Sequence, residues 1–192
     1  RKRLADGTIE KYKGRCVMRG DLMKGMDPNN CFAPSPTSIE HNCCEAVAAL
    51  RGMNDEPGDA VGAYLQGKQL PGEVVIARMP HGFREYDEND DEVYMLMLVP
   101  LYGQANAGNI WNRTFSEHCV NEEKIMPAEQ APSTFSKCVG PNCSDRIHMP
   151  VHTDDLRIFS DDTPAGLAEH DRLKKSLNTR FKMEWKYGMN PT

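Results

Sequence analysis

Long apolar runs are absent from this sequence, and their absence excludes a membrane-spanning helix. No stretch approaches the roughly 18 apolar residues that such a helix needs, so we expect no membrane partner. Residues 1–7 also lack the apolar centre of a secretion signal. What remains is typical of a soluble globular protein, because 39% hydrophobic and 27% charged residues over 192 positions suit one domain with a sizeable core.

A surplus of positive charge is missing as well. The formal net charge is −5, which argues against a surface that binds nucleic acid by charge alone. Basic residues nevertheless gather between Lys2 and Arg19 and again between Arg172 and Lys186, with most of the acidic residues between these ends. The net charge therefore does not exclude a local basic groove that binds nucleic acid.

The cysteines do not form an even set. Seven is an odd number, which argues against a secreted disulfide framework and favours a reducing, intracellular compartment. Cys138 and Cys143 flank a turn-like spacer, and His148 and His152 follow nearby, so a zinc site is one alternative. Because this spacing is loose for zinc, we predict free thiols and no zinc.

The most informative stretch runs from Met149 to Phe159 and contains the adjacent aspartates Asp154 and Asp155. Partly alternating apolar residues on both sides predict two short strands joined by a tight polar turn. Adjacent carboxylates repel each other, which is tolerable only beside water or a bound cation. Magnesium takes oxygen ligands, usually one or two carboxylates together with substrate phosphates. The pattern leaves two interpretations open, a metal site and an ordinary polar turn.

Two further aspartate pairs serve as controls. Asp90–Asp91 lies in the acidic run Glu85–Glu92, which predicts a solvated loop. Asp161–Asp162 precedes Thr163-Pro164, a pattern typical of the start of a helix. Only Asp154–Asp155 is framed by predicted strands.

Helical patterns occur in three places. Thr37 and Glu40 form a capping-box pattern, and we expect one face of the helix that follows to pack on the core. That face carries Ile39, Cys43, Val47 and Leu50. A second helix is expected to carry Ile110, Trp111, Phe115 and Cys119. A third begins at Thr163 and Pro164 and carries Leu167, Leu173, Leu177 and Phe181.

Strand patterns are spread over the whole chain. The predicted strands are residues 11–20, with basic side chains on one face, and 73–79, 93–98, 132–139 and 146–151. The segment Met53–Gly58 is polar and contains Pro57. Because proline donates no sheet hydrogen bond, we expect any strand there to be short, displaced or at a sheet edge.

Seven motifs follow one another along nearly the whole chain. They are Lys-Gly-Arg-Cys-Val-Met-Arg-Gly (13–20), Cys-Phe-Ala-Pro (31–34), Asp-Ala-Val-Gly-Ala-Tyr-Leu-Gln-Gly (59–67), Met-Pro-His-Gly-Phe (79–83), Leu-Tyr-Gly (101–103) with Trp111, Val-His-Thr-Asp-Asp (151–155) and Phe-Lys-Met (181–183). In this order they resemble the reverse transcriptase domain of copia-type retrotransposons. The corresponding motifs of that family include Thr-Phe-Ala-Pro, Asp-Val-x-x-Ala-Phe-Leu-x-Gly and Tyr-Val-Asp-Asp.

The resemblance implies roles for particular residues. Asp59, Asp154 and Asp155 would be the catalytic and metal-binding residues, with magnesium as the cofactor and manganese as its alternative. The nucleotide would be bound by Lys13, Arg15, Tyr64 and Gly103. Lys13 and Arg15 would face the phosphates, Tyr64 would press against a ribose 2′-hydroxyl, and Gly103 would allow close backbone approach.

The resemblance also implies a fold and partners. We expect an α+β fold, the fingers and palm of a right-hand polymerase over 1–192, with helices on a small, mainly antiparallel sheet and with thumb and ribonuclease H absent. The partners would be an RNA or DNA template-primer, deoxynucleoside triphosphates, and integrase and ribonuclease H segments of a polyprotein. The implied location is an intracellular one, a cytoplasmic particle and the nucleus.

A second hypothesis stays open beside the polymerase. The polar segment before Asp59 favours a degenerate, inactive remnant of a retroelement that acts at most as a nucleic-acid- or protein-binding module. Retention of Asp59, Asp154 and Asp155 favours the enzyme.

Overall fold

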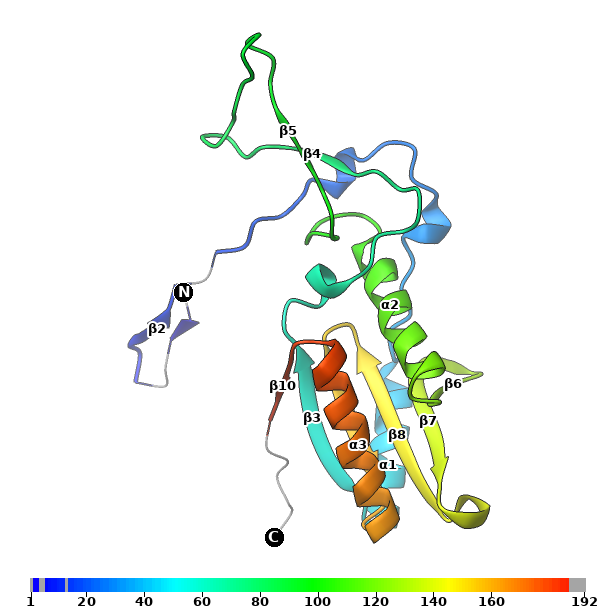
Figure 1. Cartoon of the computed structure of the whole chain (residues 1–192). Coiled ribbons are helices and arrows are strands. Elements are labelled where there is room, and N and C mark those ends of the chain that lie inside the picture. The colour runs from blue at the N-terminus through cyan, green and yellow to red at the C-terminus, as the bar shows by residue number, and fades with distance from the viewer. Residues whose placement is uncertain (1, 4–5, 13, 187–192) are drawn as a thin grey trace.

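A six-stranded antiparallel sheet forms the centre of the molecule in a computed structural model that describes residues 2–3, 6–12 and 14–186. Its spatial order is β10–β3–β9–β8–β7–β6 (Figure 1). The strands are β3 (Asn54–Ala60), β6 (Met126–Ala128), β7 (Ala131–Val139), β8 (Asp145–His152), β9 (Asp155–Ser160) and β10 (Met183–Trp185). The predicted strands 132–139 and 146–151 and the hairpin around Asp154 are therefore confirmed.

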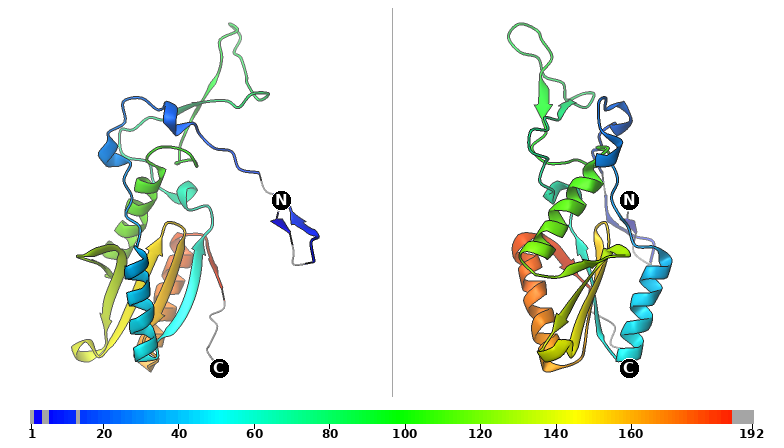
Figure 2. Two further views of the ribbon diagram at one scale, coloured as in Figure 1. Left: turned by 180° about the vertical axis from the view of Figure 1, so that it is seen from behind. Right: turned by 90° about the vertical axis from the view of Figure 1, so that its right-hand side faces the viewer.

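Helices cover both faces of this sheet. Helices α2 (Ala107–Asn121) and α3 (Pro164–Arg180) lie on one face, and α1 (Ser38–Arg51) lies on the other (Figure 2). The apolar core fills the space between the sheet and the α2–α3 pair. Its large members include Trp111, Phe115, Ile147, Met149, Leu156, Ile158, Leu173, Leu177 and Phe181. The fold is α+β, as predicted.

Strand β3 corrects the expectation for the polar segment before Asp59. It is a regular strand of seven residues between β9 and β10, neither short nor at an edge. The Pro57 carbonyl accepts a hydrogen bond from the Lys186 amide at 2.9 Å. Since the N–H and C=O of one strand residue point to the same neighbour, the donor that proline lacks is missing beside β10 and not beside β9.

Two charged residues of β3, Asp55 and Glu56, are tolerated inside the sheet because each has a partner. Asp55 is bound by Arg157 of β9, whose Nε donates at 3.0 Å. Glu56, on the opposite face, contacts Nε2 of His170 at 2.8 Å and also Lys174, both from α3. Paired charges of this kind avoid most of the penalty of burying a polar strand.

Helix α1 begins with the predicted capping box, in which Thr37 and Glu40 each accept a hydrogen bond from the other's backbone amide. The prediction of its buried face was wrong. Ile39 and Leu50 are 75% and 87% exposed, and the buried residue of the helix is Ala48. The side of α1 that meets the sheet carries Glu45, which pairs with Arg157, so charge and small size, not the aliphatic stripe, orient this helix.

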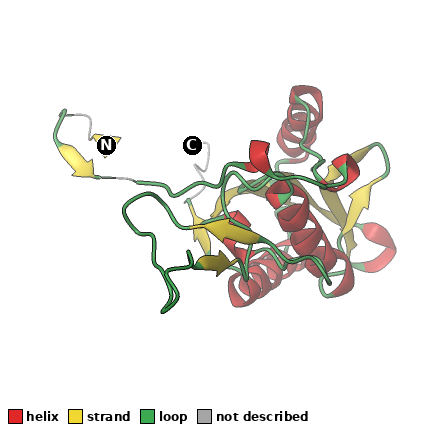
Figure 3. Cartoon of the chain, turned by 90° about the horizontal axis from the view of Figure 1, so that it is seen from above, coloured by secondary structure: helices red, strands yellow, loops and turns green. Residues whose placement is uncertain are grey.

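A separate layer lies beyond one end of the sheet. Strands β4 (Ile76–Arg78) and β5 (Tyr94–Leu96) form a hairpin there, confirming the strands predicted over 73–79 and 93–98. Short 3-10 helices connect this layer to the sheet: η1 (Gly20–Leu22), η2 (Pro28–Asn30) and η3 (Ala63–Gln66). Seen from above, the β4–β5 hairpin and the N-terminal hairpin both extend beyond the helices (Figure 3).

The strand predicted over residues 11–20 is not found. Strand β2 (Ile9–Lys11) ends where it was expected to begin, and pairs with β1 (Lys2–Arg3). The described residues 14–19 have no strand partner. Among the described residues, no helix is both long and apolar enough to cross a membrane.

The cysteine prediction was also wrong at one place. Cys138 and Cys143 form a disulfide with a Cα–Cα distance of 4.8 Å, and are neither free thiols nor zinc ligands. The bond closes the turn between β7 and β8, which contains the short helix η4 (Pro141–Cys143). This turn and the β8–β9 turn lie at opposite ends of β8 (Figure 1).

Candidate active site

Three aspartates meet at one end of the central strands. Asp59 lies near the end of β3 and pairs in register with Asp155 at the start of β9. The Ala60 amide donates to the Asp154 carbonyl at 2.7 Å, which ties the β8–β9 turn to β3. Residues almost a hundred positions apart in the sequence thus lie side by side, as the metal-site interpretation requires.

Electrostatics distinguish Asp59 from an ordinary surface aspartate. Its pKa is raised above the usual value, first by burial and then by the charges of Asp154 and Asp155. Lys186 opposes this shift and lies 3.9 Å from a carboxylate oxygen of Asp155. The site therefore concentrates negative charge that a bound cation would relieve.

The donor set fits a hard divalent ion. Within the described part of the chain, no three His, Cys, Asp or Glu side chains gather closely enough to hold a metal by themselves. Magnesium does not require such a cage, because it normally binds one or two carboxylates and completes its shell with water and substrate phosphates. Asp59 and Asp154, with Asp155 beside them in the sheet register, would supply the oxygen ligands for this mode.

The turn that carries Asp154 has an unusual backbone. Thr153, directly before it, has φ of +58°, a conformation that costs a β-branched residue about 1–3 kcal/mol. The indole N–H of Trp111 donates to the Thr153 carbonyl at 2.6 Å. The sequence placed Trp111 in a motif and on a predicted helix, and it gave no sign of this contact.

An aromatic column leads from the acidic residues toward the upper layer. The guanidinium carbon of Arg15 lies 4.3 Å from the centre of the Tyr102 ring. The rings of Tyr102 and Tyr64 are 4.9 Å apart. Burial and then the charge of Asp154 raise the pKa of Tyr64. Two of the predicted nucleotide-binding residues, Arg15 and Tyr64, are therefore joined through Tyr102, which sequence analysis noted only within Leu-Tyr-Gly.

A third predicted nucleotide-binding residue, Gly103, directly follows Tyr102 in the chain. Gly103 has φ of +84°, and a Cβ there would lie 2.2 Å from the Met18 carbonyl oxygen. The Met18 amide in turn donates to the Tyr102 carbonyl at 2.7 Å. The close approach at Gly103 is thus made by the protein's own backbone. Lys13 lies outside the described residues.

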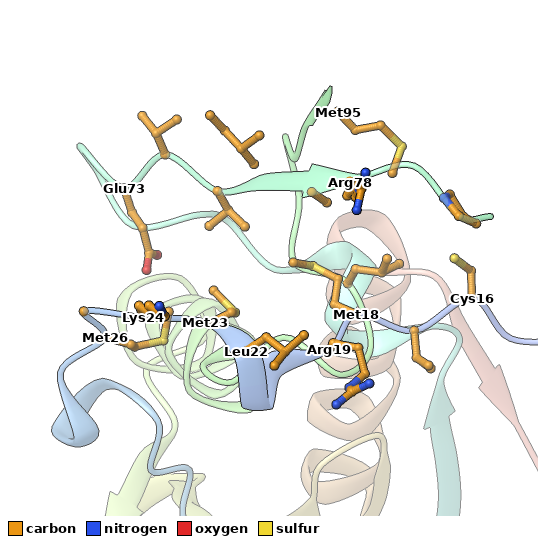
Figure 4. Close-up of a pocket in the computed structure, with 18 residues that line it drawn as sticks. Cys16, Met18, Arg19, Leu22, Met23, Lys24, Met26, Glu73, Arg78 and Met95 are labelled. Atoms are coloured by element: carbon orange, nitrogen blue, oxygen red, sulfur yellow. The ribbon is translucent and has the colours of Figure 1, made fainter. Parts of the chain in front are cut away.

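A cavity of about 760 Å³ lies in the upper layer, away from the aspartates. Methionine and aliphatic side chains form most of its lining, with Met18, Leu22 and Met23 below the strand that carries Arg78 (Figure 4). None of the three aspartates lines it. The three aspartates predicted from the sequence therefore lie at the end of the sheet and not in this cavity.

Comparison with known proteins identifies one family. The chain matches the family described as reverse transcriptase (RNA-dependent DNA polymerase) over residues 1–189. Neither a curated protein nor a solved structure gives a significant match.

Proposed function

The chain belongs to the reverse transcriptase (RNA-dependent DNA polymerase) family, and we propose that it catalyses RNA-directed DNA synthesis as the fingers and palm of a copia-type retrotransposon polymerase. The observation that carries this proposal is the meeting of Asp59 with Asp154 and Asp155 at one end of the sheet. The six-stranded sheet would be the palm, and the layer around β4 and β5 the fingers. The family implies a nucleic-acid template-primer and nucleotides as substrates.

Reverse transcriptases use divalent metal ions, and here Asp59 and Asp154 would hold magnesium, with manganese as a substitute. When bound, the ions would activate the primer 3′-hydroxyl and neutralise charge on the triphosphate. The protein's own contribution is positioning and charge. Arg15, whose guanidinium stacks over the Tyr102 ring, would offer a planar cation to the phosphates. Tyr64 would exclude a ribose 2′-hydroxyl by its bulk.

Primer extension tests the proposal directly. The parent protein should extend a DNA primer on an RNA template with deoxynucleotides and magnesium. Asp154→Asn should abolish extension while the protein remains folded, because the variant loses a charged metal ligand. Asp91→Asn is the matched control, since Asp91 belongs to an adjacent aspartate pair in the exposed acidic loop. An Asp154→Asn protein as active as the parent would refute the role of Asp154.

A metal titration separates the enzyme from the remnant. Ligand that binds only the folded state stabilises it by mass action, by about 1.4 kcal/mol at ten times its dissociation constant. Millimolar magnesium should therefore raise the Tm of the parent by a few degrees and leave the Tm of the Asp59→Asn variant unchanged. A folded parent that neither extends primers nor responds to magnesium or manganese would support the inactive, binding-only remnant.

A further inference from the structure

The turn between β8 and β9 has only two residues, Thr153 and Asp154. The strands are paired up to His152 and Asp155 on either side of it. Of the two turn residues, Thr153 has a positive φ of +58°. Glycine is the usual residue in such a hairpin position, because a β-branched side chain clashes with its own backbone there. A contact outside the hairpin is therefore needed to keep Thr153 in this conformation.

Two hydrogen bonds hold the peptide groups on either side of Asp154. The indole N–H of Trp111, from α2, donates to the Thr153 carbonyl at 2.6 Å. The backbone N–H of Ala60, from β3, donates to the Asp154 carbonyl at 2.7 Å. These carbonyls belong to the peptide planes before and after the Asp154 Cα, and each plane is rigid. Fixing both planes fixes the direction in which the Asp154 side chain leaves the backbone.

Trp111 is itself firmly held. It is 2% exposed, and its ring centre lies 5.3 Å from that of Phe181 and 5.5 Å from that of Phe115. A small cavity beside it is lined by Ala33, Pro34 and Thr153 among others, so the link 31–34 also lies next to the turn. The donor therefore cannot follow the turn if the turn moves.

We propose that Trp111 is a positioning residue for Asp154. Its indole N–H keeps Thr153 in the left-handed conformation and so directs the Asp154 carboxylate toward Asp59. The catalytic consequence rests on the proposed function, whereas the hold on the turn is a property of the fold and is measurable without activity.

The experiment compares Trp111→Phe, Thr153→Gly and the double variant with the parent. Phenylalanine keeps an aromatic ring in the core but removes the donor, and glycine adopts a positive φ without strain. Trp185→Phe is the matched control, because the indole of Trp185, the second tryptophan, donates to the Asn178 side chain at 2.9 Å, away from the turn.

The first readout is amide hydrogen exchange at two neighbouring residues of the same chain segment. The Ala60 amide donates to the Asp154 carbonyl in the turn, whereas the Val61 amide donates to the Lys182 carbonyl at 2.9 Å. Trp111→Phe should speed exchange at Ala60 by at least about tenfold relative to Val61, because the turn opens locally. Thr153→Gly should restore slow exchange in the double variant, and Trp185→Phe should leave the Ala60-to-Val61 ratio unchanged.

The second readout is primer extension. Trp111→Phe should lower kcat by about tenfold or more, since small displacements of reacting groups are costly, and Thr153→Gly should recover most of that loss. A parent without activity would contradict the proposed function alone, and exchange at Ala60 would still decide whether Trp111 holds the turn. Equal acceleration at Ala60 and Val61 without rescue would show that Trp111 acts only by packing. Altered exchange with unchanged kcat would equally overturn the positioning role.

Discussion

Tyr64 is influenced by an aromatic residue, Tyr102, and by an acidic one, Asp154. Its ring lies 4.9 Å from that of Tyr102, centre to centre, and burial and then the charge of Asp154 raise its pKa. Its side chain is half-buried. A bulky side chain at this position is what the proposed exclusion of a ribose 2′-hydroxyl requires.

Replacing Tyr64 with Ala should therefore admit ribonucleotides. The preference for deoxynucleotides over ribonucleotides, measured as the ratio of kcat/KM in primer extension, should fall by at least about tenfold, the range that a lost steric contact produces. Tyr64→Phe is the control and should keep the preference, because it preserves the ring and removes only the hydroxyl. Unchanged selectivity in the alanine variant would exclude Tyr64 as the filter.

The sequence was sufficient to find the charged residues at this scale but not the residues that hold them. Asp154 and Asp155 stand out because two apolar runs frame them, and Asp59 because of its motif. The contact from Trp111 to the Thr153 carbonyl depends on a backbone atom and a three-dimensional approach, and neither leaves a pattern in the sequence. The same holds for Tyr102, whose two ring contacts come from distant segments.

At the scale of elements, α3 is fixed to the sheet by a partly buried charge as well as by its apolar side. Glu169 accepts hydrogen bonds from Arg172, one turn further along the helix, at 2.7 and 2.8 Å. It also accepts one from Lys137 of β7 at 2.6 Å. These cations, Arg172 first, lower the pKa of Glu169 to about 2.

This shift predicts a pH-dependent loss of stability. Because the carboxyl has a lower pKa in the folded state than its ordinary 4.5, its contribution is present above pH 4.5 and is lost as the pH falls toward 2. Glu169→Gln should lower the free energy of unfolding at pH 7 by about 1–2 kcal/mol, a value reduced for solvent screening. In denaturant titrations, the difference from the parent should shrink between pH 4.5 and 2.

Glu88→Gln provides the comparison for this prediction. Glu88 is exposed in the acidic loop between β4 and β5, so its replacement should change stability little at any pH. A Glu169→Gln difference that stays constant from pH 7 to pH 2 would mean that packing, and not charge, is lost.

The elements also show where sequence patterns mislead. Helix α1 has the predicted start, yet its aliphatic stripe is exposed and Ala48 is buried. Helical spacing shows that a helix has an apolar face, but the contacts with the sheet decide which face of the helix is buried. The polar sequence of β3 favours a short or edge strand. It nevertheless forms inside the sheet, because Arg157, His170 and Lys174 of other elements pair with its carboxylates.

At the scale of the whole molecule, the upper layer is joined to the sheet where two backbone segments cross. A Cβ on Gly20 would lie 2.1 Å from the Gly103 carbonyl oxygen, and one on Gly103 would lie 2.2 Å from that of Met18. Each glycine therefore makes room for the other segment's backbone. This crossing leads directly to Tyr102 and the aromatic column, so it links the position of the upper layer to that of Arg15.

Gly103→Ala should weaken the contact between the upper layer and the rest of the molecule. The added methyl meets backbone, which cannot turn aside as a side chain can, and alanine also resists the φ of +84°. Strain and clash together should lower the free energy of unfolding by about 2–5 kcal/mol. Gly72→Ala isolates the strain, because Gly72 has φ of +79° with open space around it, and should cost only about 1–2 kcal/mol. Chemical denaturation measures both values. Equal losses in the two variants would show that the crossing tolerates the added methyl group and that the layers are joined elsewhere. A larger loss at Gly103, with weaker nucleotide binding, would identify the crossing as the contact that keeps Arg15 against Tyr102.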